Sequence, residues 1–183
     1  MRKIYILLVL GLFFAGYAVS VQRMETVLAD GKTILLPLAP RDPRALLMGD
    51  YMDLRYMVND RIRDALREAK TASGTDAGTE GLAVLRVRHE PVAQAADFVR
   101  LDDGSPLQSD EFYLAYKLRG HRVITAATAY YFQEGTARHY ESARFGQFKL
   151  AANGKTILVG LCNTGGKLIQ PQNSGEKKVN NEF

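Results

Sequence analysis

The sequence predicts an α+β, β-rich fold: a mainly antiparallel sheet domain with one short amphipathic helix, preceded by an N-terminal transmembrane helix. An uncharged apolar run near the N-terminus indicates the membrane helix, short alternating runs indicate the strands, and one segment with apolar residues at helical spacing indicates the second helix. Strands and helices do not alternate along the chain, which argues against a doubly wound parallel sheet. Hydrophobic residues make up 46% and charged residues 24% of the 183, proportions typical of a folded globular protein.

The first segment predicts a membrane anchor. Arg2 and Lys3 precede an apolar run from Ile4 to Val21, and a helix needs roughly 17–25 such residues to cross the hydrocarbon core. The early cations favour a cytoplasmic N-terminus, which places the rest of the chain outside. A cleaved signal peptide is the alternative, because Ala18 to Ser20 fits a small-x-small cleavage site. Both interpretations predict an extracytoplasmic domain.

The length favours one folded domain with attachments at its ends. We assign residues 1–22 to the membrane anchor or signal peptide and residues 23–164 to the extracytoplasmic domain. Residues 165–183 are rich in polar side chains, and we assign them to a C-terminal tail.

The first strands of the domain are expected directly after the anchor. Two β-prone runs flank Asp30-Gly31, which predicts a hairpin because glycine accepts a positive φ in a tight turn. Pro40 and Pro43 then interrupt any ladder, since proline donates no backbone hydrogen bond. The next run predicts a strand with one buried face, because apolar residues occupy every second position: Met52, Leu54, Tyr56 and Val58.

The pattern then changes to that of a helix and afterwards back to strands. Residues 59–70 predict the amphipathic helix, since Ile62, Leu66 and Ala69 fall at helical spacing. Further strands are predicted at 82–90, 95–101, 111–120 and 122–134, a helical turn at 137–144, and a last hairpin at 145–161. Asn153-Gly154 is expected to form the turn of that hairpin.

Charge and cysteine content restrict the classes of function. The net charge is only +4 and the basic residues are scattered, whereas nucleic-acid binding needs a dense basic stripe, so we expect no nucleic-acid partner. A single cysteine, Cys162, excludes an intramolecular disulfide, and its apolar neighbours predict a buried thiol. The three histidines are far apart and no nucleophile or nucleotide motif occurs, so we predict no catalytic residue, metal or cofactor.

Two stretches concentrate the candidate binding residues. Gly49-Asp50 predicts a turn at the entry of a strand, with Asp50 and Tyr51 at its rim. The second stretch, from Tyr130 to Gly146, gathers aromatic and charged side chains around Gly135.

Each stretch has a functional and a structural interpretation. Asp50 with Glu134 or Glu141 would make an acid/base pair if the fold brought these carboxylates together. In the structural interpretation, Tyr130 and Phe132 lie on a core face, and Glu141 pairs with an arginine one helical turn away, Arg138 or Arg144.

The octamer GDYMDLRY resembles the signature of the GDYXXLXY protein family, with matching residues Gly49, Asp50, Tyr51, Leu54 and Tyr56. The segments LAPRDPRALLMGDYMDLRY, YYFQEGTARHYESARFGQFKL and GKTILVGL are similar to other strong segments of that family. They add the motif positions Glu134, Gly135, Tyr140, Glu141, Arg144 and Gly146. Phe145 departs from the pattern, because tyrosine is expected there. The resemblance implies a bacterial protein with an N-terminal anchor, found beside multi-pass membrane proteins, and it implies no particular activity.

Three hypotheses for function follow. In the first, the chain is a single-pass protein of a bacterial inner membrane whose periplasmic domain is a binding or accessory module for a membrane-protein partner. In the second, it is an anchored hydrolase-like enzyme that uses Asp50 with Glu134 or Glu141. In the third, it has a purely structural role in the envelope. The anchor, the β-rich domain and the missing catalytic signature favour the first hypothesis.

Overall fold

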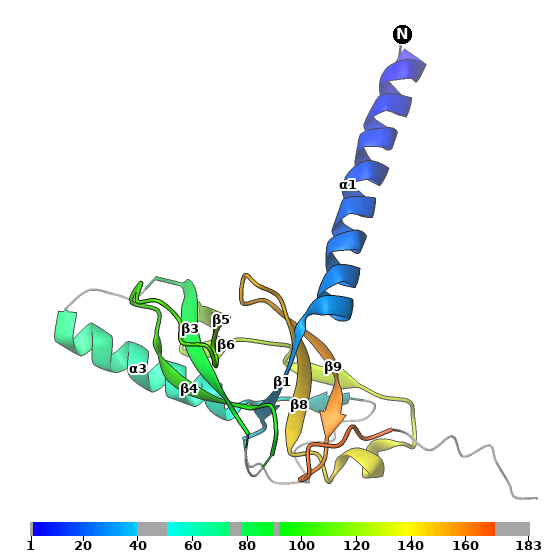
Figure 1. Cartoon of the computed structure of the whole chain (residues 1–183). Helices are drawn as coiled ribbons and strands as arrows, with labels where there is room; N and C mark the ends of the chain where they lie inside the picture. The colour runs from blue at the N-terminus through cyan, green and yellow to red at the C-terminus, as the bar shows by residue number, and fades with distance from the viewer. Residues whose placement is uncertain (1, 40–50, 74–77, 90–91, 171–183) are drawn as a thin grey trace, which may run out of the picture.

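The computed structural model describes residues 2–39, 51–73, 78–89 and 92–170. Its first element, helix α1 (Arg2–Asp30), stands away from the rest of the chain (Figure 1), and its side chains from Ile4 to Val21 are exposed. α1 is long and apolar enough to cross a membrane, as the sequence predicted.

The prediction of a hairpin around Asp30-Gly31 is wrong, because residues 25–30 form the last turns of α1. The Gly31 N–H donates to the carbonyl of Val27 (2.9 Å), so helical hydrogen bonding continues to the residue before the first strand. Extending an existing helix fixes only one residue for each hydrogen bond gained, whereas starting a new element fixes several, and this outweighs the strand preference of Thr26 and Val27. Only the second half of the expected hairpin is a strand, β1 (Lys32–Pro37).

The main sheet has seven strands in the order β6-β5-β3-β4-β1-β8-β9, antiparallel throughout except for the parallel pair β1 and β4. Its other members are β3 (Glu80–Arg88), β4 (Ala95–Leu101), β5 (Glu111–Arg119), β6 (Arg122–Ile124), β8 (Phe145–Leu150) and β9 (Thr156–Cys162). The sheet is curled, so the turn between β8 and β9 reaches β5, where the Ala115 N–H donates to the Gly154 carbonyl (2.9 Å). The predicted α+β, mainly antiparallel fold is confirmed.

Two expected strands are shorter than predicted. The run 122–134 contains β6 and β7 (Ala129–Tyr131) with a bend between them, and β7 pairs with β2 (Tyr51–Asp53) in a separate two-stranded sheet. The strand expected to continue to Val58 ends at Asp53, and Met57 begins helix α3 (Met57–Ser73). The predicted alternation of burial still holds, since Met52, Leu54, Tyr56 and Val58 are all at most 4% exposed.

The main hydrophobic core lies between the sheet and α3, which contacts β1, β4 and β6 (Figure 1). The amphipathic helix predicted at 59–70 is therefore confirmed. It begins two residues earlier and ends three residues later than predicted. It buries Val58, Ile62 and Leu66 against inward-facing residues of the strands. The helical turn expected at 137–144 is present as η1 (Ala137–Tyr140).

A smaller set of buried residues lies on the opposite face of the sheet, including Leu35 and Cys162. The chain after β9 folds back there: Leu168 forms a bridge with Cys162, and the Ile169 N–H donates to the Leu161 carbonyl (2.8 Å). The predicted buried thiol is confirmed, because Cys162 is fully buried and burial raises its pKa. Residues 165–170, the described part of the expected tail, thus border the sheet.

Glu111 connects three strands of the sheet. Its carboxylate accepts hydrogen bonds from Arg86 on β3 (2.9 Å) and from Arg100 on β4 (3.3 Å), while its own side chain on β5 is 3% exposed. The backbone N–H of Gln108 also donates to it (3.2 Å). This N–H, followed by the two arginines, holds the pKa of Glu111 below its usual value.

We expect Glu111→Gln to lower the melting temperature of the full chain at neutral pH. Because the folded-state pKa is depressed, the contribution of the carboxylate is complete above the usual value of 4.5 and is lost as the pH falls through the folded-state value. The difference from wild type should therefore shrink below about pH 4.5, as circular dichroism in an uncharged detergent would show. Glu80→Gln is the matched control, since Glu80 makes only an exposed ion pair with Lys117. A difference that did not change with pH would contradict the assignment.

Candidate functional site

The described residues of the GDYMDLRY octamer, from Tyr51 to Tyr56, hold the segment 127–131 in place. Tyr51 pairs with Tyr131 in the small sheet, and the Leu54 N–H donates to the carbonyl of Thr128 (2.8 Å). The hydroxyl of Tyr56 donates to the carbonyl of Ala127 (2.6 Å). Three positions of the motif thus bind three successive parts of one distant segment, which fixes its path without a long strand.

Tyr56 is 1% exposed, and its ring meets that of Phe148 edge to face, with 5.5 Å between the ring centres. The motif residue Gly146 makes this contact possible. A Cβ atom at Gly146 would lie 2.8 Å from the Phe148 ring and 3.3 Å from the Tyr56 ring. Burial raises the pKa of Tyr56, so its hydroxyl keeps its proton and remains a hydrogen-bond donor.

Tyr140 is also part of the core. It is 2% exposed, and its ring lies 5.2 Å from the ring of Tyr130 and 5.3 Å from that of Phe132. Burial, together with a hydrogen bond to Tyr130, raises the pKa of Tyr140 to about 12. The expected core position of Tyr130 and Phe132 is confirmed, since both pack against the core cluster.

The charged candidates lie on the surface. Glu134, Glu141 and Arg144 are exposed, as is Gly135, whose φ of +80° is the left-handed conformation that favours glycine. The expected ion pair of Glu141 with Arg138 or Arg144 is not formed. The Arg144 guanidinium instead donates to the backbone carbonyls of Ala143 (2.9 Å) and Glu141 (3.3 Å).

Gly49 and Asp50 lie outside the described residues, so the suggested pairing of Asp50 with Glu134 or Glu141 stays a prediction. Tyr51 is half-buried, with its ring 5.7 Å from the exposed ring of Tyr131. Within the part of the chain that the structure describes, no group of three or more His, Cys, Asp and Glu side chains is placed to hold a metal ion.

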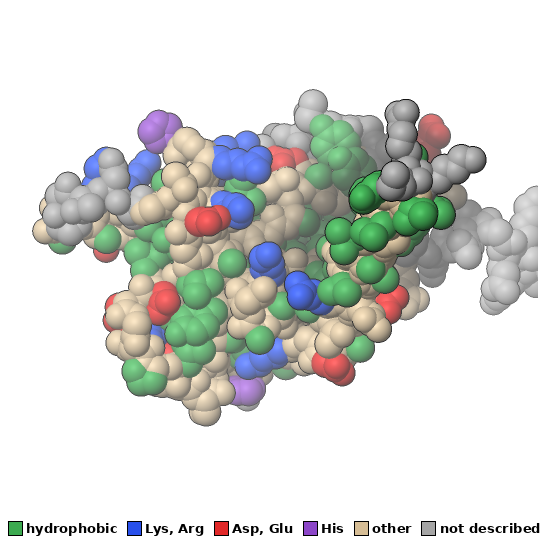
Figure 2. All heavy atoms as spheres, turned by 90° about the horizontal axis from the view of Figure 1, so that it is seen from above, with side chains coloured by type: hydrophobic (Ala, Val, Ile, Leu, Met, Phe, Trp, Pro, Cys, Tyr) green, Lys and Arg blue, Asp and Glu red, His purple; other side chains and the backbone are tan. Residues whose placement is uncertain are grey.

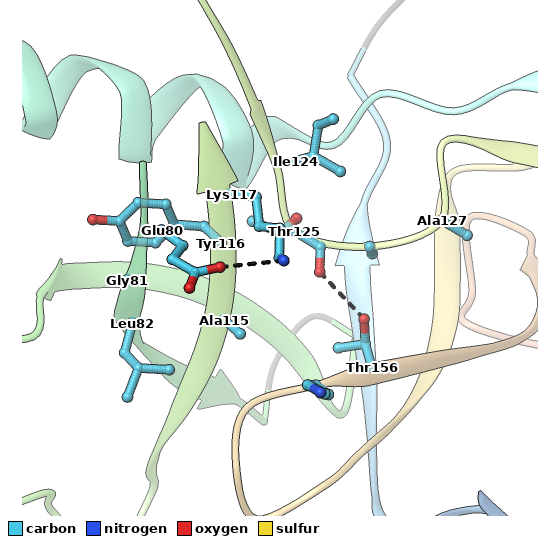
Figure 3. Close-up of a pocket in the computed structure, with 12 residues that line it drawn as sticks. Glu80, Gly81, Leu82, Ala115, Tyr116, Lys117, Ile124, Thr125, Ala127 and Thr156 are labelled. Carbon is cyan, nitrogen blue, oxygen red and sulfur yellow. Dashed lines mark hydrogen bonds and ion pairs between the residues drawn. The ribbon is translucent and has the colours of Figure 1, made fainter. Parts of the chain in front are cut away.

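A groove of about 710 Å³ lies beside the segment held by the motif (Figure 3). It is bordered by β3 and β5, by the chain after β6, and by the end of the β8–β9 hairpin. The lining residues are Glu80, Gly81, Leu82, Ala115, Tyr116, Lys117, Ile124, Thr125, Ala126, Ala127, Lys155 and Thr156. Most are small or apolar, and the two lysines supply positive charge.

Polar contacts within the groove fix its walls. Lys117 and Glu80 form an ion pair (3.2 Å), and the Thr156 hydroxyl donates to the Thr125 carbonyl (3.3 Å), as Figure 3 shows. The Tyr116 ring lies over Gly81, where a Cβ atom would come within 2.6 Å of the Tyr116 hydroxyl oxygen. Burial raises the pKa of Tyr116, so this hydroxyl is neutral at ordinary pH.

The motif therefore contributes to the groove through its wall. Ala127 lines the groove and accepts the Tyr56 hydrogen bond. The sequence interpretation missed the groove, because its residues come from four separate segments that only the curled sheet brings together. The small residues of TAAT at 125–128, inside the single strand predicted at 122–134, were the available signal.

We expect Tyr56→Phe to lower the free energy of unfolding by about 1 kcal/mol, because it removes one partly buried hydrogen bond while keeping the ring. Chemical denaturation of the full chain in an uncharged detergent, followed by circular dichroism, would measure the change. Tyr131→Phe is the matched control and should change stability by less than about 0.5 kcal/mol, since Tyr131 is 75% exposed. Equal effects of the two substitutions would show that the Tyr56 hydroxyl does not hold the groove wall.

Comparison with known proteins supports the resemblance seen in the motif. The family model described as GDYXXLXY protein matches residues 13–161. Comparisons with curated proteins and with solved structures gave no match. The matched region includes the C-terminal half of the apolar segment, the motif and nearly all of the main sheet. It also includes Ala127 and Phe148, the residues that Tyr56 contacts. The chain belongs to the GDYXXLXY protein family.

Proposed function

We propose that this chain is a membrane-anchored extracytoplasmic binding module, accessory to a multi-pass membrane protein. The observation that carries the proposal is the direct junction between α1 and the domain. Helix α1 ends at Asp30 and β1 begins at Lys32, inside the main sheet, so a single residue joins the apolar helix to the core.

The junction leaves no room for a side chain at Gly31. A Cβ atom there would clash with the Val27 carbonyl oxygen and would lie 3.1 Å from that of Leu150. The Lys149 ammonium donates to the Gly31 carbonyl (3.1 Å), which ties the junction to β8. Such contacts limit the angles that the helix and the domain can adopt, in contrast to a flexible linker.

The helix also sets the height of the domain. Residues 22–30 continue α1 beyond the apolar run, and at about 1.5 Å per residue they span roughly 13 Å. A domain held this close to the bilayer, at a restricted angle, is suited to a partner that itself projects only slightly from the membrane. Extracytoplasmic loops of multi-pass membrane proteins have that property.

The groove is the proposed docking site. Its lining is largely apolar. Among the described lining residues, Glu80 pairs with Lys117, so Lys155 supplies the remaining positive charge. This lining suits a loop that carries apolar and acidic side chains.

For location, we propose that α1 is retained in a bacterial inner membrane, with a cytoplasmic N-terminus and a periplasmic domain. Arg2 and Lys3 support this orientation, and the apolar run from Ile4 to Val21 is long enough to span the bilayer.

We expect the intact mass of the chain, purified from a membrane fraction, to include the N-terminal 20 residues. Protease added outside spheroplasts should digest the domain and leave α1 protected. Recovery in a periplasmic extract of a chain that begins after Ser20 would instead identify the segment as a signal peptide.

We expect a photo-crosslinking amino acid at Lys117, in the groove, to capture a multi-pass membrane protein in intact membranes. The same amino acid at Lys167, on the exposed turn after β9, is the matched control and should not capture it. A flexible Gly-Ser insertion between Asp30 and Gly31 should reduce capture at least severalfold, because it releases the domain from its fixed height. Equal capture from both positions, or capture unaffected by the insertion, would contradict the proposal.

A further inference from the structure

A second hollow, of about 280 Å³, lies between α3 and the hairpin of β5 and β6. Its lining residues are Arg63, Leu66, Arg67 and Lys70 from the helix and Leu118, Gly120 and His121 from the hairpin. Three cations and an imidazole therefore surround a small apolar floor. None of the described residues that line it carries a carboxylate.

The three cations follow one side of α3. Arg67 is four residues beyond Arg63, and Lys70 three residues beyond Arg67, spacings that place side chains next to each other on a helix. Like charges at these spacings destabilise a helix unless opposite charges compensate them. An anion bound between α3 and the hairpin would supply such an opposite charge to Arg67.

Only some of these basic side chains have a carboxylate partner within the described domain. The Arg63 guanidinium pairs with Asp60 (2.8 Å) and Asp64 (3.7 Å). The side chains of Arg67 and His121, by contrast, make no hydrogen bond or ion pair with the rest of the described chain. Within the described part of the chain, the Arg67 guanidinium thus has no carboxylate partner.

In a neighbouring hollow, by comparison, an aspartate pairs with two of the arginines. It contains Arg55, Arg63 and Arg122, but Asp60 lines it as well. Asp60 pairs with Arg55 (3.8 Å) and with Arg63 (2.8 Å), and the hollow encloses only about 40 Å³. Of these two hollows, the larger one is lined by an arginine, Arg67, that has no carboxylate partner among the described residues.

We propose that this second hollow between α3 and the β5–β6 hairpin, the basic cleft, binds a phosphate-type anion. The planar guanidinium of Arg67 can donate two parallel hydrogen bonds to phosphate oxygens, and Lys70 and His121 can supply further donors from both sides. Leu66 and Leu118 give the ligand an apolar surface to rest on, which suits an organic phosphate. The β5–β6 turn shapes one wall, since Gly120 has a φ of +59° and lets the chain turn directly before His121.

The phosphate group can come from a lipid headgroup or from a free anion. Lys and Arg side chains are visible at several places on the face from which α1 leaves the domain (Figure 2), and that face turns towards the bilayer when α1 stands upright in it. Phosphate at the membrane surface and soluble phosphate esters share the chemistry that this cleft recognises, so the test separates the two sources.

The first arm titrates the full chain, in an uncharged detergent, with sodium pyrophosphate by isothermal calorimetry. Arg67→Ala and His121→Ala should each weaken binding, the former by about tenfold, because a charge-assisted hydrogen bond is lost. Arg61→Ala is the matched control: it removes an exposed arginine from the same helix that does not line the cleft, and binding should stay within about twofold.

The second arm places the full chain in nanodiscs of phosphatidylcholine alone or with one quarter phosphatidylglycerol and compares hydrogen exchange of α3. Slower exchange with phosphatidylglycerol, abolished by Arg67→Ala and kept in Arg61→Ala, identifies the lipid headgroup as the source. Pyrophosphate binding without that slowing identifies a free anion. The inference is overturned if neither arm gives a response, or if Arg61→Ala and Arg67→Ala reduce the response equally.

Discussion

The packing of Tyr56 against Phe148, together with the hydrogen bond from its hydroxyl to Ala127, joins β8 of the main sheet to the segment between β6 and β7. The Tyr56 ring fits only because Gly146 on β8 has no side chain to occupy the same space. Its hydroxyl then fixes the chain between β6 and β7, where no regular ladder supplies hydrogen bonds. One side chain therefore connects the interior of the main sheet to the segment that leaves it.

This connection explains why the segment can bend and still be well placed. Thr125 is bound on both sides, since its hydroxyl donates to the Asn59 side chain (2.6 Å) and its carbonyl accepts from Thr156. Thr128 and Ala127 accept bonds from the motif. Side chains and single backbone groups thus do the work that strand pairing does elsewhere, and they leave one side of the segment open as a groove wall.

Local patterns predicted most of the sheet. β4 and the β8–β9 hairpin follow from alternation and from Asn153-Gly154, because both signals are contained in a few neighbouring residues. The hairpin at Asp30-Gly31 had the same kind of signal, but there a helix that begins in the apolar segment continues through the turn residues. Burial of Leu54 and Tyr56 was predictable from alternation, whereas the fit of Tyr56 to Gly146 and both hollows depends on contacts between distant segments.

The hairpin of β5 and β6 belongs to both proposed sites. On β5, Lys117 lines the groove and the next residue, Leu118, lines the basic cleft. Ile124 on β6 lines the groove, whereas His121, in the turn before β6, lines the cleft. A change that displaces the hairpin therefore alters both sites together. Arg67 differs, because it belongs to α3 and lines the cleft but not the groove. Its removal should therefore affect anion binding and leave the walls of the groove unchanged.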